Sequence, residues 1–229
     1  MSKSIAIIPA RGGSKRIKRK NIRDFHGKPL IAYSIRTALK SQLFEKVIVS
    51  TDDKEIAKIA RDYGAKTPFL RPDNLSDDFT GTGAVVKHAL EFLKDQGEEY
   101  DYACTIYATA PLLQKHYLIE GFERLKNSDA KYAFSCTSMP FPIQRTFKID
   151  NGKCQMFWPE HFTSRSQDLP EAYQDAGQFY WNRLSVNTEE IMFGADSIPI
   201  VLPRHLVQDI DTLEDWKRAE MMYQLIDHE

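Results

Sequence analysis

Short apolar runs alternate with longer amphipathic segments along much of this 229-residue chain. The first run, residues 4–9, is too short for a helix and is typical of a strand buried in a parallel sheet. Pro29 suits the first turn of a helix, and apolar residues then recur at helical spacing as far as Leu39. Helical patterns also lie between the further strand-forming runs, which span residues 47–50, 102–108, 132–137 and 198–202. This order predicts an α/β fold: a mostly parallel, twisted, Rossmann-like sheet with helices on both faces.

The pattern changes at approximately residues 140–185, where short alternating segments are rich in aromatic residues and proline. We interpret this stretch as a small inserted β-rich lobe within a single domain that spans residues 1–229. A closing helix then follows, with Trp216, Ala219 and Tyr223 on its core side.

The overall composition excludes several classes of protein. Basic and acidic residues number 31 and 32, so the net charge gives no reason to expect nucleic acid or an anionic membrane as a partner. The apolar run at residues 5–10 is too short for a signal peptide or a membrane span, and we expect a cytoplasmic protein. The three cysteines form no Cys-x-x-Cys pair and the histidines lack zinc-ligand spacing, which favours reduced thiols and no zinc site.

A strongly basic loop, which we define as residues 11–23, follows the first strand. It contains no acidic residue, although the whole chain has a net charge of only −1. Its cations are Arg11, Lys15, Arg16, Lys18, Arg19, Lys20 and Arg23. Such a concentration of charge repels itself and is favourable if a polyanion binds there. Gly12 and Gly13 would let backbone amides approach phosphate oxygens.

The spacing in this loop matches neither a P-loop nor a dinucleotide-binding fingerprint. Two other interpretations remain for the loop. It could be a solvated basic turn, or it could be a nucleic-acid patch, although no interleaved aromatic residues accompany it.

Asp209 and Asp211 form an acidic pair just before the closing helix. At this spacing in extended backbone both carboxylates point to one face, which suits Mg²⁺. Asp211 could instead begin a capping box with Glu214. A second pair, Asp52 and Asp53, precedes another helix and is better explained as its N-terminal cap.

Several motifs resemble those of the cytidylyltransferases that activate nine-carbon acidic sugars. The resemblance begins with Ile-Pro-Ala-Arg-Gly-Gly-Ser-Lys-Arg at residues 8–16, Lys-Asn at 20–21 and Gly-Lys-Pro-Leu at 27–30. It covers nearly the whole chain, with further matches at residues 49–53, 69–72, 165–168 and 209–212. It implies a nucleotidyltransferase fold, CTP and a nine-carbon sugar acid as substrates, Mg²⁺ as cofactor, and a homodimer whose inserted lobe crosses to the partner subunit.

The resemblance also implies roles for individual residues. The nucleotide contacts would be Ala10, Arg11, Gly12, Gly13, Ser14, Lys15, Lys20 and Asn21, with Arg71 on the cytosine side. The catalytic residues would be Arg11, Lys15, Lys20 and Asp211. The metal ligands would be Asp209 and Asp211. The sugar-binding residues would be Tyr107, Thr109, Arg165, Gln167, Asp175, Gln178 and Tyr180.

Three segments look like the branch that activates pseudaminic acid, and two of them, residues 107–111 and 175–181, differ from the branch that activates sialic acid. These are Tyr-Ala-Thr-Ala-Pro at residues 107–111, Phe-Pro-Ile-Gln-Arg at 141–145, and Asp-Ala-Gly-Gln-Phe-Tyr-Trp at 175–181. The differences lie where the sugar would bind. The alternatives are the same reaction on N-acetylneuraminic or legionaminic acid, a hexose-phosphate nucleotidyltransferase, a glycosyltransferase, and a regulatory module that only binds CTP.

The expected reaction is an in-line attack of the sugar's anomeric hydroxyl on the α-phosphorus of CTP, which releases pyrophosphate. Arg165 is the candidate for gripping the sugar carboxylate, because a guanidinium can form two parallel hydrogen bonds, but it could instead form an inter-subunit salt bridge. Phe179, Tyr180 and Trp181 could form an apolar wall for the sugar substituents, although Trp181 could equally pack inside the lobe.

Overall fold

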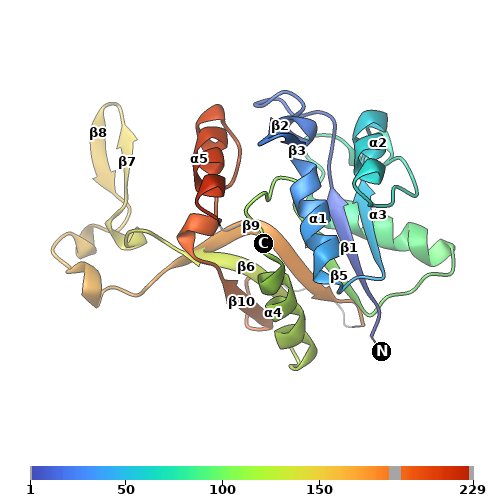
Figure 1. The fold of residues 1–229 in the computed structure, drawn as a ribbon. Coiled ribbons are helices and arrows are strands. Elements are labelled where there is room, and N and C mark those ends of the chain that lie inside the picture. Colours follow the sequence, from blue (N-terminus) through green and yellow to red (C-terminus); the bar gives the residue numbers. More distant parts are fainter. Residues whose placement is uncertain (1, 186–191, 227–229) are drawn as a thin grey trace.

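A six-stranded sheet forms the centre of the computed structural model, which describes residues 2–185 and 192–226 (Figure 1). The strand order is β10-β6-β9-β5-β1-β4, and within the described residues only β9 runs antiparallel to its neighbours. The strands are β1 (Ser4–Pro9), β4 (Lys46–Ser50), β5 (Tyr102–Ile106), β6 (Tyr132–Ser138), β9 (Tyr173–Arg183) and β10 (Ser197–Val201). A short hairpin, β2 (Asp24–Phe25) and β3 (Lys28–Pro29), follows the basic loop.

Helices cover both faces of this sheet. They are α1 (Ile31–Ser41), α2 (Lys54–Asp62), α3 (Thr82–Asp95) and α4 (Lys115–Lys126), while α5 (Leu213–Gln224) packs beside the β2-β3 hairpin. Alternate residues of β1 enter different clusters: Ile8 packs with side chains of α1 and α4, and Ile7 packs with side chains of α3. A separate aromatic cluster, which includes Phe25 and Trp216, holds α5 against the hairpin. The mostly parallel α/β fold expected from the sequence is confirmed.

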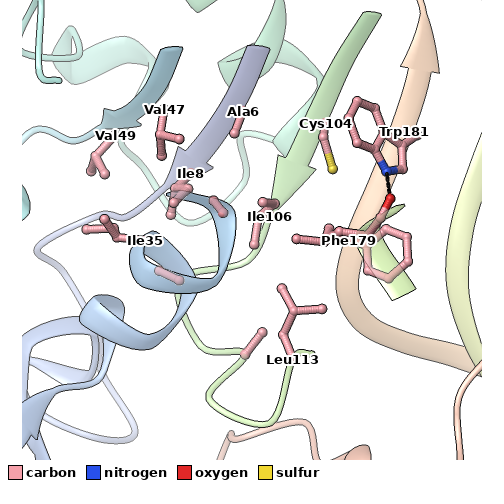
Figure 2. Packing of buried hydrophobic residues seen from close by; sticks show 14 of the residues in the cluster. Ala6, Ile8, Ile35, Val47, Val49, Cys104, Ile106, Leu113, Phe179 and Trp181 are labelled. Atoms are coloured by element: carbon pink, nitrogen blue, oxygen red, sulfur yellow. Dashed lines mark hydrogen bonds between the residues drawn. The ribbon is translucent and has the colours of Figure 1, made fainter. Parts of the chain in front are cut away.

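Strand β9 differs from the expectation of an inserted lobe that continues to about residue 185. It lies between β5 and β6 inside the main sheet, so the central sheet resumes at residue 173. Its side chains Phe179 and Trp181 are fully buried among the helices, and the Trp181 indole donates to the Leu118 carbonyl oxygen at 3.1 Å (Figure 2). Gly121 of α4 allows this packing, because a Cβ there would lie 3.0 Å from Phe179. Phe179 and Trp181 are therefore core residues and do not form a wall for a ligand.

The excursion from the sheet spans residues 139–172, and we call it the arm. Its base is closed by a hydrogen bond from the Met139 amide to the Ala172 carbonyl oxygen at 2.8 Å. The arm contains a two-stranded ribbon, β7 (Phe147–Asp150) and β8 (Lys153–Met156), and short 3-10 turns. It extends away from the rest of the molecule in Figure 1, and its ribbon strands are almost wholly exposed.

Candidate nucleotide site

A cleft of about 580 Å³ lies beyond the carboxyl ends of β1 and β5, and we call it the main cleft. Such a position is where ligands bind in open α/β sheets. Four separate parts of the chain meet there: the basic loop, the segment before α3, the segment after β5, and the segment before α5. The expected site residues that line it are Arg11, Ser14, Lys15, Lys20, Asn21, Arg71, Tyr107, Thr109 and Asp211.

The basic loop and the segment before α5 approach each other at one end of this cleft. Arg16 forms an ion pair with Asp211 at 2.7 Å. The Lys20 ammonium donates to the Ile210 carbonyl oxygen at 2.5 Å and lies 3.4 Å from Asp211. Asn21 donates to the Arg11 carbonyl oxygen at 2.9 Å and so fixes the loop's own path. Elements separated by about 190 residues thus place cations beside a carboxylate.

Asp211 is available for these contacts because it does not cap α5. The capping box is formed by Thr212 and Asp215, one residue later than the alternative with Asp211 and Glu214 requires. Thr212 accepts from the Asp215 amide at 3.2 Å, and the Asp215 carboxylate accepts from the Thr212 amide at 2.8 Å. The capping interpretation of Asp211 is therefore wrong.

Asp209 stands near Asp211 but is not among the residues that line the main cleft. Partial burial and the negative charge of Asp211 raise the pKa of the Asp209 carboxyl, while Lys20 opposes the shift. Two carboxylates in electrostatic contact favour the binding of a cation between or beside them.

Asp52 and Asp53 have separate roles. Asp53 caps α2, since its carboxylate accepts from the Glu55 and Ile56 amides, and it pairs with Arg19. Asp52 accepts from the Gly12 amide at 2.9 Å and lies 3.7 Å from the buried Arg71 guanidinium. It therefore joins the basic loop to the arginine expected on the cytosine side.

The structure gives a reason for Gly12 that differs from the expected one. A Cβ at this position would lie 2.8 Å from the Asp53 carboxylate, so only glycine allows the loop to pass so close to α2. Gly12, Gly13 and Ala10 are not among the residues that line the main cleft. Ala10 extends the pairing of β1, because its amide donates to the Ser50 carbonyl oxygen at 2.9 Å.

A second cavity of about 850 Å³ adjoins the main cleft, and Tyr107 and Thr82 line both. Asp175, Tyr180 and Asn182 of β9 also line this second cavity. The Tyr180 hydroxyl donates to Asp175 at 2.6 Å, and burial raises the pKa of Tyr180. The Tyr107 and Tyr180 rings lie 5.2 Å apart. The two cavities together could hold a ligand with an anionic part and a less polar part.

Three expected sugar-binding residues lie elsewhere. Gln178 is buried, donates to the Leu206 carbonyl oxygen at 2.5 Å, and lines neither cavity. Arg165 and Gln167 are exposed on the arm, where Arg165 pairs with Asp168 at 2.6 Å. The structure does not bring these two arm residues to either cavity of their own chain.

Sequence reasoning missed four residues of this region. Arg16 was visible only as one of several basic residues, Asp52 was interpreted as part of a helix cap, and Asp78 and Asn182 have no distinctive local pattern. Asp78 pairs across the main cleft with Arg11 and Lys15. The Asn182 Oδ1 is a buried acceptor for which the described part of the chain provides no hydrogen-bond partner. These roles depend on contacts between distant segments.

Two further features concern metals and membranes. Among residues 2–185 and 192–226, no three or more histidine, cysteine or acidic side chains gather in a way that could hold a metal ion by themselves. None of the described helices is long and apolar enough to cross a membrane.

Comparison with known proteins places these features in context. Residues 5–217 match the sequence profile of the family described as cytidylyltransferase. A pseudaminic acid cytidylyltransferase of Campylobacter jejuni is 49% identical over 229 residues, which cover 99% of this chain and 98% of the relative. An N-acylneuraminate cytidylyltransferase of Escherichia coli is 32% identical, over 95% of this chain and 51% of the relative.

The fold also has solved counterparts. The structure of a CMP-2-keto-3-deoxy-manno-octonic acid synthetase complexed with CTP superimposes with a TM-score of 0.66. It covers 98% of this chain and 100% of the other, at 19% identity. At this identity the likeness concerns the fold.

Proposed function

This chain belongs to the cytidylyltransferase family, and we propose that it transfers CMP from CTP to the anomeric hydroxyl of pseudaminic acid, with release of pyrophosphate. The choice of sugar is supported by the 49% identity with the Campylobacter jejuni pseudaminic acid cytidylyltransferase, compared with 32% for the N-acylneuraminate enzyme. The observation that carries the mechanism is the meeting of the basic loop with Asp211 at the main cleft.

The basic loop would bind the triphosphate. Arg11, Lys15 and Lys20 all line the main cleft, where they would neutralise the phosphates and the departing pyrophosphate. Lys20 is already oriented, because its ammonium is held by the Ile210 carbonyl oxygen. Asn21 and Asp52 both hold the peptide bond between Arg11 and Gly12, so the loop backbone beside Arg11 needs little reorganisation when the nucleotide enters.

The donor set of Asp209 and Asp211 fits Mg²⁺. Both ligands are hard carboxylate oxygens, and a cation bound beside them would offset the burial of Asp209 and its repulsion from Asp211, which together raise the pKa of Asp209. Two protein ligands suit an ion that normally keeps waters and phosphate oxygens in its coordination shell. Mg²⁺ bound there would polarise the α-phosphate and lower the pKa of the attacking hydroxyl.

The second cavity is our candidate for the sugar. It adjoins the main cleft at Tyr107, so a ligand could reach from one into the other. Tyr107 and Tyr180 present aromatic surface to the acyl and methyl substituents of such a sugar. Asn182 offers an acceptor for a sugar hydroxyl or amide, and Asp175 is held by Tyr180.

We further propose that the active form is a homodimer in which the arm binds a second copy of the chain. The arm exposes large apolar side chains that the described part of a single chain does not cover: Phe141, Phe147, Ile149, Phe157 and Phe162. Surface of this kind favours a protein interface. Because Arg165 lies on the arm, it would reach the sugar carboxylate of the partner subunit and not that of its own.

We also propose that the protein is located in the cytoplasm. Cys104, Cys136 and Cys154 are free thiols, as expected in a reducing compartment.

One product analysis tests the proposed function. The purified protein would be incubated with CTP and Mg²⁺ and offered pseudaminic, legionaminic or N-acetylneuraminic acid separately, with product masses recorded. We expect the mass of CMP-pseudaminic acid, and much less product from the other acids. A hexose 1-phosphate in parallel tests the nearest rival class. Turnover only with the sugar phosphate, or CTP binding without any product, would contradict the proposal.

A further inference from the structure

Asp78 bridges two cations of the basic loop from the opposite wall of the main cleft. Its Oδ1 accepts from the Arg11 guanidinium at 2.5 Å, and its Oδ2 pairs with the Lys15 ammonium. All three residues line the cleft. One carboxylate thus occupies a position between two cations, as a phosphoryl group of a bound triphosphate would.

The turn that carries Asp78 keeps its shape without these ion pairs. The Asp77 carboxylate accepts from the Phe79 amide at 2.9 Å and from the Thr80 amide at 2.7 Å. Arg11 also fastens the turn by donating to the Asp77 carbonyl oxygen at 3.0 Å. Phe79 is 94% exposed, so displacing the turn would uncover little apolar surface. The contacts with Arg11 and Lys15 are therefore the main resistance to its movement.

Asp78 and a triphosphate cannot share the same cations without strong repulsion. Lys15 and Arg11 hold the pKa of the Asp78 carboxyl below its usual range, so this side chain is ionised at neutral pH. An incoming nucleotide must therefore replace the charged carboxylate oxygens of Asp78 with its own phosphate oxygens. The net gain in ion pairs is smaller than the number of phosphate contacts suggests.

We propose that Asp78 is an internal substitute for a nucleotide phosphate, which holds Arg11 and Lys15 in place until CTP displaces it and thereby limits the affinity for CTP. This inference rests on the proposed function in that the displacing ligand is CTP. Asp78 acts through the two cations and is a positioning residue. The carboxylate also keeps the repelling charges of the basic loop together before the nucleotide arrives.

Asp78→Asn tests this role, because it keeps the side-chain shape and removes the charge. Asp73→Asn is the matched control, since Asp73 lies exposed in the same segment but does not line the cleft. Asp78→Glu preserves the charge. Calorimetric titrations would use CTP and, separately, inorganic tripolyphosphate, without sugar acid and over a range of KCl concentrations.

We expect Asp78→Asn to bind both ligands about two- to tenfold more tightly. Its affinity should also fall more steeply with salt, because more ion pairs form on binding. The Asp73→Asn and Asp78→Glu proteins should resemble the wild type. Unchanged or weaker binding by Asp78→Asn, or an equal gain in Asp73→Asn, would overturn the inference.

The two ligands separate this inference from the proposed function. If the wild type does not bind CTP but Asp78→Asn binds tripolyphosphate more tightly than the wild type does, the proposed function fails. The role of Asp78 as a substitute for a phosphate then stands. If the wild type binds CTP and Asp78→Asn binds it no better, the role of Asp78 fails alone. A wild type that binds neither ligand would contradict both.

Discussion

The basic loop at residues 11–23 and the arm at residues 139–172 both leave the central sheet, but different forces hold them. Contacts within the chain hold the loop: Arg16 and Lys20 meet Asp211, and Arg19 meets Asp53. The arm forms few contacts beyond itself and leaves Phe147 53% and Ile149 71% exposed. One chain therefore holds the basic loop with its own residues, whereas its arm leaves an apolar surface exposed.

The largest expected effect is on turnover, from a change at Asp211, which the basic loop contacts. Asp211→Asn should lower turnover about 10²- to 10³-fold, because it removes charge from the point where the loop and the acidic pair meet. Its melting temperature should stay near that of the wild type, since Asp211 does not cap α5. Asp215→Asn is the control, because it weakens the capping box and should lower stability more than turnover. Near-normal turnover in Asp211→Asn would remove this residue from the mechanism.

Subunit mixing tests whether the arm completes a partner's site. Lys20→Ala and Arg165→Ala should each be nearly inactive alone. The first removes a cation that would bind the triphosphate, and the second removes the proposed contact with the sugar carboxylate. If the arm of one subunit serves the cleft of the other, an equal mixture of the two variants after subunit exchange should recover about a quarter of wild-type activity, because half of the random dimers contain one intact site. No recovery, in mixtures shown by mass spectrometry to contain heterodimers, would place Arg165 in its own subunit's site or outside the site.

A polar substitution on the arm should separate assembly from nucleotide binding. Ile149→Lys should weaken the dimer and raise KM for the sugar acid about tenfold, while the Kd for CTP changes little, because CTP contacts lie in the main cleft. Light scattering and steady-state kinetics would measure these quantities. Leu225→Ser is a control, since it alters an apolar residue of similar exposure, 80% compared with 71% for Ile149, outside both the arm and the main cleft. A monomeric wild type would contradict this separation of assembly from nucleotide binding. So would an Ile149→Lys protein in which the KM for the sugar acid and the Kd for CTP change together.

The smallest effect concerns the anchoring of the loop by Asp53. Hydrogen bonding from Arg19, helped by the α2 amides, lowers the pKa of Asp53. A lowered folded-state pKa stabilises the protein above the unfolded value of about 3.9. This contribution is lost as pH falls through the lowered folded-state value.

Asp53→Asn can still cap α2, and so it isolates the charge. We expect a loss of about 1 kcal/mol in unfolding free energy at pH 7. The difference in unfolding free energy between the variant and the wild type should disappear at acid pH. Urea denaturation at several pH values measures it. A gap independent of pH would show that the charge is not responsible.

The sequence allowed the main sheet and the basic loop to be predicted because both depend on local patterns. Apolar runs such as residues 4–9 indicate a buried strand, and clustered cations favour the binding of a polyanion. The placement of β9 could not be predicted in this way, because its antiparallel pairing with β5 and β6 joins segments far apart in the chain. A run of aromatic residues is equally compatible with a lobe and with a core strand.

The acidic residues show the same limit on a smaller scale. Capping patterns one residue apart are nearly equivalent in sequence, yet the choice of Thr212 over Asp211 leaves the Asp211 carboxylate at the cleft. The roles of Asp52 and Asp78 became clear only when their partners Gly12, Arg11 and Lys15 were placed beside them. Residues whose role is to pair with a distant element leave little local signal.

A crystal structure with CTP and Mg²⁺ tests most directly whether the basic loop and the acidic pair serve one triphosphate. We predict that the phosphates lie in the main cleft, with Arg11, Lys15 and Lys20 on one side and the metal on Asp209 and Asp211 on the other. The triphosphate bound instead in the separate cavity lined by Arg36 and Lys115, or a metal far from Asp211, would contradict this account.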